Sequence, residues 1–527
     1  MNFYIILFLL ILVFEMIKSK RSFSALQNNM YNEGNRYIKW LLNNVKALVF
    51  TLDFLAVVTI LIAYLFNNKV TFILVLISSM FYLLEGLRIL NKERNIKKNR
   101  LVVTKRIKRL MATSTVITFL PIILYFINRD NMVLVLLIES ILTYFNDIIV
   151  LLCLFINYPV DYFNNKFNRV KAERKMETLN KLDVIGIAGS YGKTITKNIL
   201  DSIFSTKYTT KKTPRNLNTE HSLVLAINKY LDRSDQIFIA EMGAYKQGEI
   251  RKQCNLVNPK YAVITSIDLV HIDTFGSLEN IVKAKFELVE SLPYDGVAVL
   301  NMDDINQSSY NIKNKCKKIW IGIDNKNADI VASNISYSNK GSKFTVKLKN
   351  DKKEYLFETK LLGKYNVYNI LSSIALGLEY GFKIEELNKI IKDLKVPDSK
   401  LELIDLDYMY ELNDLGNNNP LGVKYALEVL DSMDGVKVIV TSGMFKDDAK
   451  ERRLNQMFGN QIAGICDYII LVNSKKSRKI FDGIMENGYD KDRLFVVNDL
   501  DKAYSLIQEF KENKKIYTLI EGNLEED

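Results

Sequence analysis

Five apolar stretches in the first third of the 527-residue chain constrain its fold more than any other feature. They are Phe3–Ile17, Ala47–Phe66, Val70–Leu90, Met111–Ile127 and Met132–Ile156. Most of them reach the roughly 20 residues that a helix needs to cross a bilayer core. The first stretch lacks a basic n-region and a small-residue cleavage site, which argues against a signal peptide. The sequence therefore predicts an N-terminal helical membrane domain of about five transmembrane helices, residues 1–157.

The charge distribution supports this interpretation and predicts an orientation. Residues 1–160 contain 18 Lys and Arg against 8 Asp and Glu, whereas the rest of the chain contains 54 against 52. The excess gathers in loops 18–46 and 91–110, and positive loops stay in the cytoplasm. We therefore expect a multi-pass protein of the cytoplasmic membrane, in contact with lipid, with its N-terminus outside and its remaining domains inside. The nearly neutral remainder argues against a nucleic-acid partner.

Asp53, Glu85, Glu139 and Asp147 are acidic residues that lie inside the predicted spans. Ionisable residues within a membrane are functional candidates by default. Asp53 and Glu85 also permit a structural interpretation, because both lie near the predicted cytoplasmic edge and Glu85 has Arg88 one turn away. For Glu139 and Asp147 the sequence leaves both interpretations open.

The remaining chain reads as α/β. Residues 158–180 are polar and basic and predict a linker helix. From Asp183 onward, short β-rich runs alternate with helical patterns, which is typical of a mostly parallel sheet. Residues 326–360 alternate with period two and predict an antiparallel addition. We therefore expect two α/β domains, residues 181–397 and residues 398–527.

The available residue types exclude several kinds of metal site. The four cysteines are far apart and form no CxxC pair, which argues against a disulfide framework or a cysteine zinc site. The chain has only two histidines, His221 and His271, so a site built from several histidines is excluded.

The segment GSYGKT predicts a phosphate-binding loop. It follows the apolar run VIGIA and precedes the helical pattern TKNILDSIF, which is the strand–loop–helix context that such loops need. Gly189 and Gly192, with Ser190 between them, let backbone N–H groups approach phosphate oxygens at a helix N-terminus. In this context we expect Lys193 to bind the β- and γ-phosphates of ATP and Thr194 to ligate Mg²⁺.

Three further polar residues follow neighbouring elements of the predicted sheet. Glu241 ends the apolar run QIFIA, at the sheet edge where a metal ligand is expected. His271 follows the run YAVITSI and should face the same edge, and Lys285 lies in the helical pattern ENIVKAKFELVESL. On composition alone, a solvated acid at a strand end is an equally good interpretation of Glu241. On the same basis His271 is a structural side chain and Lys285 is a solvated lysine.

The order and spacing of these motifs resemble the Mur ligase family, and most closely its MurF-type members. The segments that carry the resemblance are GSYGKT, NLNTE, IAEMGAYKQGEI, HIDTFGSLENIVKAKFELV and VLNMDD. The resemblance covers about residues 183–527 and implies a P-loop central domain followed by a Rossmann-like C-terminal domain. The five predicted spans do not resemble the UDP-binding first domain that is usual in the family.

The resemblance implies ATP-dependent amide ligation. In this family ATP phosphorylates a substrate carboxylate, and an amine then attacks the acyl phosphate. It also implies that Glu241 and His271 are ligands of a second Mg²⁺. Lys285 resembles the family's lysine that is carbamylated with CO₂. By this resemblance Lys193, Lys285 and His271 are the catalytic residues.

Further nucleotide and substrate contacts are implied by the same resemblance. Asn301 is similar to the asparagine near the adenine. Lys400 stands where the family usually has an arginine, and with Asp414 it is expected on the nucleotide side. Asn218 and Asn417 are expected on the substrate side. The substrates implied are a small-molecule or lipid-linked cell-wall precursor and an amino acid or dipeptide.

Three other functions stay open. A Mur-type ligase that acts on another carboxylate, such as a capsule polymer, would share the same motifs. A membrane transporter with its own P-loop ATPase is less compatible, because an LSGGQ-like signature is absent. A catalytically weak scaffold is opposed by the retained Glu241, His271 and Lys285.

Overall fold

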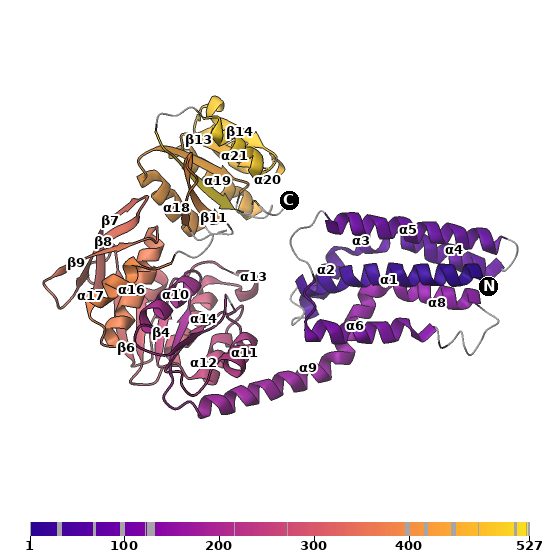
Figure 1. Cartoon of the computed structure of the whole chain (residues 1–527), viewed down its shortest axis with the longest axis horizontal. Helices are drawn as coiled ribbons and strands as arrows, with labels where there is room; N and C mark the ends of the chain where they lie inside the picture. Colours follow the sequence, from indigo (N-terminus) through magenta and orange to yellow (C-terminus); the bar gives the residue numbers. More distant parts are fainter. Residues whose placement is uncertain are drawn as a thin grey trace. The chain divides into compact units, whose positions relative to one another are not determined.

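The computed structural model forms two compact units, one up to Lys166 and one from Phe167 onward (Figure 1). The described residues are 2–28, 34–66, 70–94, 101–121, 123, 132–215, 217–270, 272–395, 401–415, 420–443, 449–472, 474–510, 514–522 and 524.

The N-terminal unit is a bundle of helices. They are α1 (Asn2–Asn28), α2 (Gly34–Asn43), α3 (Val45–Val49), α4 (Leu52–Phe66), α5 (Thr71–Arg94), α6 (Lys105–Thr118), α8 (Met132–Tyr144) and the first part of α9 (Asn146–Glu177). An apolar core joins α1, α4, α5 and α8 through side chains such as Leu7, Ile60, Val75 and Leu136. Large apolar side chains also cover the outside of these helices, which is unusual for a water-exposed bundle.

Two of the described helices are long and apolar enough to cross a membrane by length and composition. These are Thr71–Lys92 and Asn146–Glu177, whereas Leu52–Phe66 and Met132–Tyr144 are apolar but shorter. The prediction of about five transmembrane helices is therefore not confirmed. The sequence pattern overlooked two interruptions, because apolar runs do not reveal where a helix breaks. The stretch that begins at Ala47 is broken between α3 and α4, and the stretch that begins at Met132 is broken at Phe145.

The residues of the predicted linker helix do not begin a new helix. They belong mostly to α9, which runs from Asn146 to Glu177 and has Pro159 inside it. The boundary predicted at residue 157 therefore lies within a continuous helix.

The first sheet of the second unit has nine strands. They are β1 (Asp183–Ala188), β2 (Thr210–Lys212), β3 (Ile237–Glu241), β4 (Tyr261–Ile264), β5 (Val297–Asn301), β6 (Lys317–Gly322), β7 (Ile330–Ser338), β8 (Gly341–Leu348) and β9 (Glu354–Thr359). Their order is β2-β3-β1-β4-β5-β6-β7-β8-β9. Pairing is parallel as far as β7 and antiparallel from β7 to β9, which confirms the predicted parallel sheet with an antiparallel addition.

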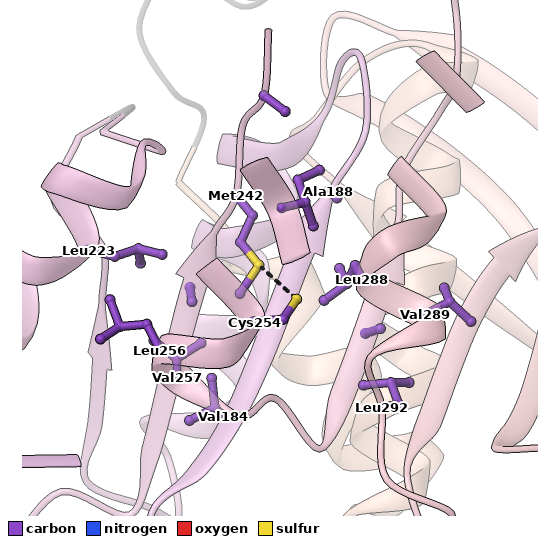
Figure 2. Close-up of a cluster of buried hydrophobic side chains, with 14 of the residues drawn as sticks. Val184, Ala188, Leu223, Met242, Cys254, Leu256, Val257, Leu288, Val289 and Leu292 are labelled. Carbon is purple, nitrogen blue, oxygen red and sulfur yellow. Dashed lines mark hydrogen bonds between the residues drawn. The ribbon is translucent and has the colours of Figure 1, made fainter. Parts of the chain in front are cut away.

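Helices cover both faces of this sheet, which explains why β1, β3 and β5 are apolar almost throughout. Figure 2 shows one face, where Val184 of β1 and Met242 pack with Cys254 of α12 (Glu249–Val257) and Leu288 of α14 (Leu278–Glu290). The opposite face packs on α10 (Lys193–Phe204), α16 (Lys364–Glu379) and α17 (Ile384–Lys392). Three further helices of the segment that forms this sheet are α11 (Glu220–Tyr230), α13 (Ile272–Phe275) and α15 (Ile305–Ser308).

The second sheet is a separate, mostly parallel one. Its strands are β10 (Glu402–Asp405), β11 (Met409–Leu415), β12 (Val436–Thr441), β13 (Tyr468–Val472), β14 (Leu494–Val497) and β15 (Ile516–Gly522), in the order β10-β11-β15-β12-β13-β14. It packs with α18 (Pro420–Ser432), α19 (Ala449–Ala463), α20 (Ser474–Glu486) and α21 (Leu500–Gln508). This is the Rossmann-like arrangement expected for the C-terminal part of the chain.

Candidate functional site

The phosphate loop lies where the sequence predicts it, between β1 and α10. In the nine-stranded sheet β1 is flanked by β3 and β4, so the loop, the end of β3 and the end of β4 share one carboxyl edge. Ligands of open α/β sheets bind at such an edge. Ser190 is fixed in this loop, because its hydroxyl donates to the Asp268 carbonyl at 3.0 Å and accepts from the Asp268 N–H at 2.9 Å.

Gly192 is required by the geometry of the loop. It is the N-cap of α10 with φ of 82°, a conformation that residues with a side chain rarely adopt. A Cβ atom there would lie 2.5 Å from Asn369 Oδ1 and 2.8 Å from Tyr365 Oη. Because glycine provides no capping side chain, the N–H groups of the first turn of α10 remain directed at the loop, where an anion is favoured.

A cavity opens beside the loop, with an empty volume of about 380 Å³ that includes open solvent. Its lining comprises Gly189, Ser190, Lys193, Asn218, Gly243, Ala244, Tyr245, Val270 and Lys285. The Lys193 ammonium donates to the Gly189 carbonyl at 2.8 Å and to the Ser190 carbonyl at 3.0 Å. It is thus held over the loop, where phosphate oxygens would be expected to replace those carbonyls.

The second lysine of the cavity, Lys285, is buried and has a lowered pKa. Only 5% of it is exposed, so the solvated interpretation is wrong for this side chain, although it holds for the neighbouring Lys283. Burial and repulsion from the Lys193 ammonium lower the pKa of Lys285 to about 7. Burial also lowers the pKa of Lys193, against the attraction of Glu241. One buried and one half-buried lysine lining the same cavity make it a site for a polyanion.

Glu241 connects the elements around the loop. It is 1% exposed, so it is not a solvated strand end. Its Oε2 accepts from Thr194 Oγ1 at 3.0 Å and from Lys197 Nζ at 2.8 Å, and its Oε1 accepts from Asn218 Nδ2 at 3.2 Å. The carboxylate therefore joins helix α10 to strand β3 and to the segment before α11.

Thr194 and Glu241 also fit a magnesium ion. Mg²⁺ prefers oxygen ligands and is commonly held by one or two carboxylates together with substrate phosphates. The hydroxyl and carboxylate oxygens meet beside the phosphate loop, as that coordination requires. The described residues hold no group of three or more His, Cys, Asp or Glu side chains suited to a metal, so the phosphates would have to complete the coordination.

The other predicted site residues are only partly brought together. Asn218 lines the cavity. Asn301 ends β5, outside the cavity lining, and its Oδ1 accepts from the Asp303 N–H at 3.0 Å. Asp414 lies in the second sheet, where its carboxylate accepts from the Leu401 N–H at 3.2 Å. His271, Lys400 and Asn417 lie outside the described residues, so their predicted roles stay predictions.

The sequence interpretation missed Lys197. Its ammonium is paired with Glu241, both side chains are 1% exposed, and it also donates to the Arg215 carbonyl. The available sequence signal is spacing: Lys197 follows Lys193 by four residues and therefore shares its helix face. Tyr245 also lines the cavity, and nothing in the local sequence pattern distinguishes it from a surface tyrosine.

Comparison with known proteins identifies the architecture. Residues 187–377 match the Mur ligase middle domain. The UDP-N-acetylmuramoyl-tripeptide–D-alanyl-D-alanine ligase of Bacillus subtilis is 32% identical over 334 residues, which cover 63% of this chain and 70% of that relative. The chain belongs to the Mur ligase family. The Escherichia coli ligase of the same name is 28% identical over 59% of this chain and 69% of its own length.

Solved Mur ligase structures share this fold. MurF from Acinetobacter baumannii superposes with a TM-score of 0.60 at 23% identity, over 68% of this chain and 77% of that one. The MurF ligase of Thermotoga maritima in complex with ADP gives 0.59 at 19% identity, over 68% and 80%. With its MurF-type relatives, this Mur ligase is an ATP-dependent acid–amino-acid ligase.

We predict that Lys197→Met destabilises the second unit, from Phe167 onward, which we call the ligase unit. The free energy of unfolding should fall by about 3–5 kcal/mol, because the substitution leaves the Glu241 carboxylate buried without its cation. Chemical denaturation followed by circular dichroism measures this change. Lys212→Met is the matched control, since Lys212 forms a half-exposed ion pair with Asp201 at 2.8 Å and should cost at most about 1 kcal/mol. Adding Glu241→Gln to Lys197→Met should restore most of the loss. Equal losses in the two single variants would contradict the role given to this pair.

We also predict that Lys285 titrates near pH 7 in the nucleotide-free protein. Reductive methylation with ¹³C-formaldehyde labels lysines, and the chemical shift of each dimethylated amine reports its protonation. The Lys285 signal should move around pH 7. That of Lys283, two residues away, should move above the usual lysine range, because Glu279 raises its pKa. The variants Lys285→Arg and Lys283→Arg assign the signals, and a Lys285 midpoint near 10 would contradict the prediction.

Proposed function

We propose that this Mur ligase activates a carboxylate of a cell-wall precursor as an acyl phosphate and joins it to an amino acid or dipeptide, as in MurF. The carrying observation is the pair Lys193 and Lys285 in one cavity with the phosphate loop. Phosphoryl transfer depends mainly on positioning and on charge stabilisation. The glycine loop and the Lys193 ammonium would supply both, and Lys285 lies beside them as the group proposed below to become a carbamate.

The chain's own groups divide the work. The loop from Gly189 to Gly192 and the first turn of α10 would bind the triphosphate. Lys193 would exchange its two carbonyl acceptors for β- and γ-phosphate oxygens. Thr194 and Glu241 would hold Mg²⁺, which neutralises phosphate charge when bound. Asn218, which already donates to Glu241, would orient the substrate side of the same edge.

The lowered pKa of Lys285 supports its proposed carbamylation. With a pKa of about 7, roughly half of the Lys285 amines are neutral at neutral pH, whereas an ordinary lysine is almost fully protonated. A neutral amine nitrogen can attack the carbon of CO₂, form the N–C bond and lose one proton. The product is an anionic carbamate, which would remove the repulsion between Lys285 and Lys193.

We place this reaction at the cytoplasmic face of a membrane. Support comes from the two long apolar helices, from the exposed apolar side chains of the N-terminal unit and from its basic loops. A membrane-bound ligase could receive a lipid-linked precursor as readily as a soluble one. A related ligation of another carboxylate, such as a capsule polymer, would use the same loop and lysines.

We predict ATP-dependent phosphate release that requires both UDP-N-acetylmuramoyl-tripeptide and D-alanyl-D-alanine, with the new amide detected by mass spectrometry. Detergent-solubilised full-length protein with Mg²⁺ is the sample. Lys285→Ala should reduce release by about 100-fold or more, because it removes the side chain that forms the proposed carbamate. A short-chain carboxylic acid should partly restore activity if the carbamate is the active form.

Lys283→Ala is the control on the same helix, and it should retain wild-type activity because its side chain is 52% exposed. Nucleotide binding without stimulation by the two substrates would point to another acceptor, and lipid-linked carboxylates would then be tested. Full activity of Lys285→Ala would remove the proposed role of this lysine.

We predict that a reporter protein fused after Lys166 lies in the cytoplasm, so that only reporters that function there are active. Alkaline phosphatase, which needs the outside, should be inactive there, and a fluorescent protein should be bright. The protein should stay with the membrane fraction after a high-salt wash, which removes proteins held by surface charge alone. Release by salt or an active phosphatase would contradict the proposed location.

A further inference from the structure

A row of buried polar side chains runs through the N-terminal unit. We call it the polar seam. On α1 it consists of Glu15, Lys18, Ser19 and Ser22, and on α8 and the start of α9 it consists of Glu139, Thr143 and Asn146. None of these residues is more than 8% exposed. Their spacings of three, four and seven residues place the α1 set on one helix face, and Glu139 and Thr143 on one face of α8.

The two halves of the seam face each other in a fixed register. Asn146 Nδ2 donates to Ser19 Oγ at 2.5 Å, Lys18 Nζ to the Tyr144 carbonyl at 2.9 Å, and Arg21 Nη2 to Asp147 Oδ2 at 3.0 Å. These pairs are 126 or 127 residues apart, so the helices run in the same direction. The same offset sets Glu15 level with Ile141, two residues or about 3 Å along the axis from Glu139.

The cations of this region are already paired. Lys18 forms a buried ion pair with Asp53, and Arg21 pairs with Asp147. Glu85, whose partner was expected from its spacing, contacts Arg88 at 3.4 Å. Among the described residues, no cationic side chain pairs with Glu15 or Glu139. Two carboxyl groups are therefore buried in one bundle without a balancing positive charge.

Of these two carboxyl groups, Glu139 is the more deeply buried and has fewer hydrogen-bond partners. It is 0% exposed, and neither of its carboxylate oxygens has a hydrogen-bond partner among the described residues. The same holds for Thr143 Oγ1 on the same face of α8, and for Asn146 Oδ1 at the start of α9. Glu15 has hydroxyl partners, Thr118 and Ser19, and the Ser19 Oγ donates to its Oε1 at the long distance of 3.5 Å. It also interacts electrostatically with Glu139.

A buried carboxylate without a partner is strongly unfavourable, and either a bound proton or a bound cation would relieve it. Carboxylate, hydroxyl and amide oxygens are the ligands that hard metal cations prefer. We propose that Glu15 and Glu139, with Thr143, bind a hard metal cation inside the N-terminal unit. Two carboxylates match the charge of a divalent ion, and Na⁺ offers the same chemistry with one charge.

The test follows the melting of the helical unit. The chain has two tryptophans, and Trp40, stacked on Tyr37 at 5.6 Å, belongs to this unit. In a Trp320→Phe background, Trp40 fluorescence therefore reports its unfolding. Full-length protein in detergent, freed of metal by a chelator and without nucleotide, is titrated with Ca²⁺, Mg²⁺ or Na⁺, and choline chloride keeps the ionic strength constant.

The Tm of the reference protein should rise with each tenfold increase of the cation that binds. Glu139→Gln should abolish this dependence and melt no lower than the reference in metal-free buffer. Glu85→Gln is the matched control, since Glu85 is equally buried but already paired, and it should respond like the reference. Equilibrium dialysis with ⁴⁵Ca²⁺ or ²²Na⁺ checks binding directly, also if Glu139→Gln fails to fold.

A response to Ca²⁺ or Mg²⁺ alone identifies a divalent site, and a response to Na⁺ alone a monovalent one. Two outcomes would overturn the proposal. One is a Tm that depends on pH and on none of the three metals, which means that protons alone neutralise the pair. The other is a metal response that survives in Glu139→Gln.

Discussion

The Glu241 carboxylate is the interaction on which the ligase site depends. One buried side chain accepts hydrogen bonds from Thr194, Lys197 and Asn218, so it ties together three segments that are distant in the sequence. Its charge is tolerable in the interior because the Lys197 ammonium is buried with it. The arrangement holds the first turn of α10 against the end of β3, where both the phosphates and a magnesium ion would need to be positioned.

The same principle, that buried charge must be balanced, distinguishes the two units of the chain. In the ligase unit the imbalance is positive, since Lys193 and Lys285 line one cavity and depress the basicity of Lys285. In the helical unit the imbalance is negative, since Glu15 and Glu139 have no cationic partner among the described residues. Each excess indicates the sign of what the site accepts, an anion in one case and a cation in the other.

Much of the ligase fold was predictable from sequence, because its rules are local. Apolar runs followed by helical patterns predicted the parallel sheet, and a glycine loop between such elements predicted the phosphate site. Lys197 and the burial of Lys285 were not predictable, because they depend on which helix face packs against the sheet. The lengths of the apolar helices in the N-terminal unit were also not predictable, since hydropathy does not reveal the breaks before Leu52 and at Phe145. The predicted roles of His271, Lys400 and Asn417 stay predictions.

The contacts of Lys193 have a consequence for selectivity. Its ammonium is already hydrogen-bonded, because it donates to two carbonyls of its own loop. An incoming anion must therefore exchange with these carbonyls rather than simply add to a free cation. A halide offers a single contact and gains little from that exchange. A polyphosphate offers several oxygens, which can replace both carbonyls while also reaching the loop N–H groups. The loop with Lys193 bound to its carbonyls thus discriminates between anions by the number of contacts that they offer. This selection does not involve the nucleotide base.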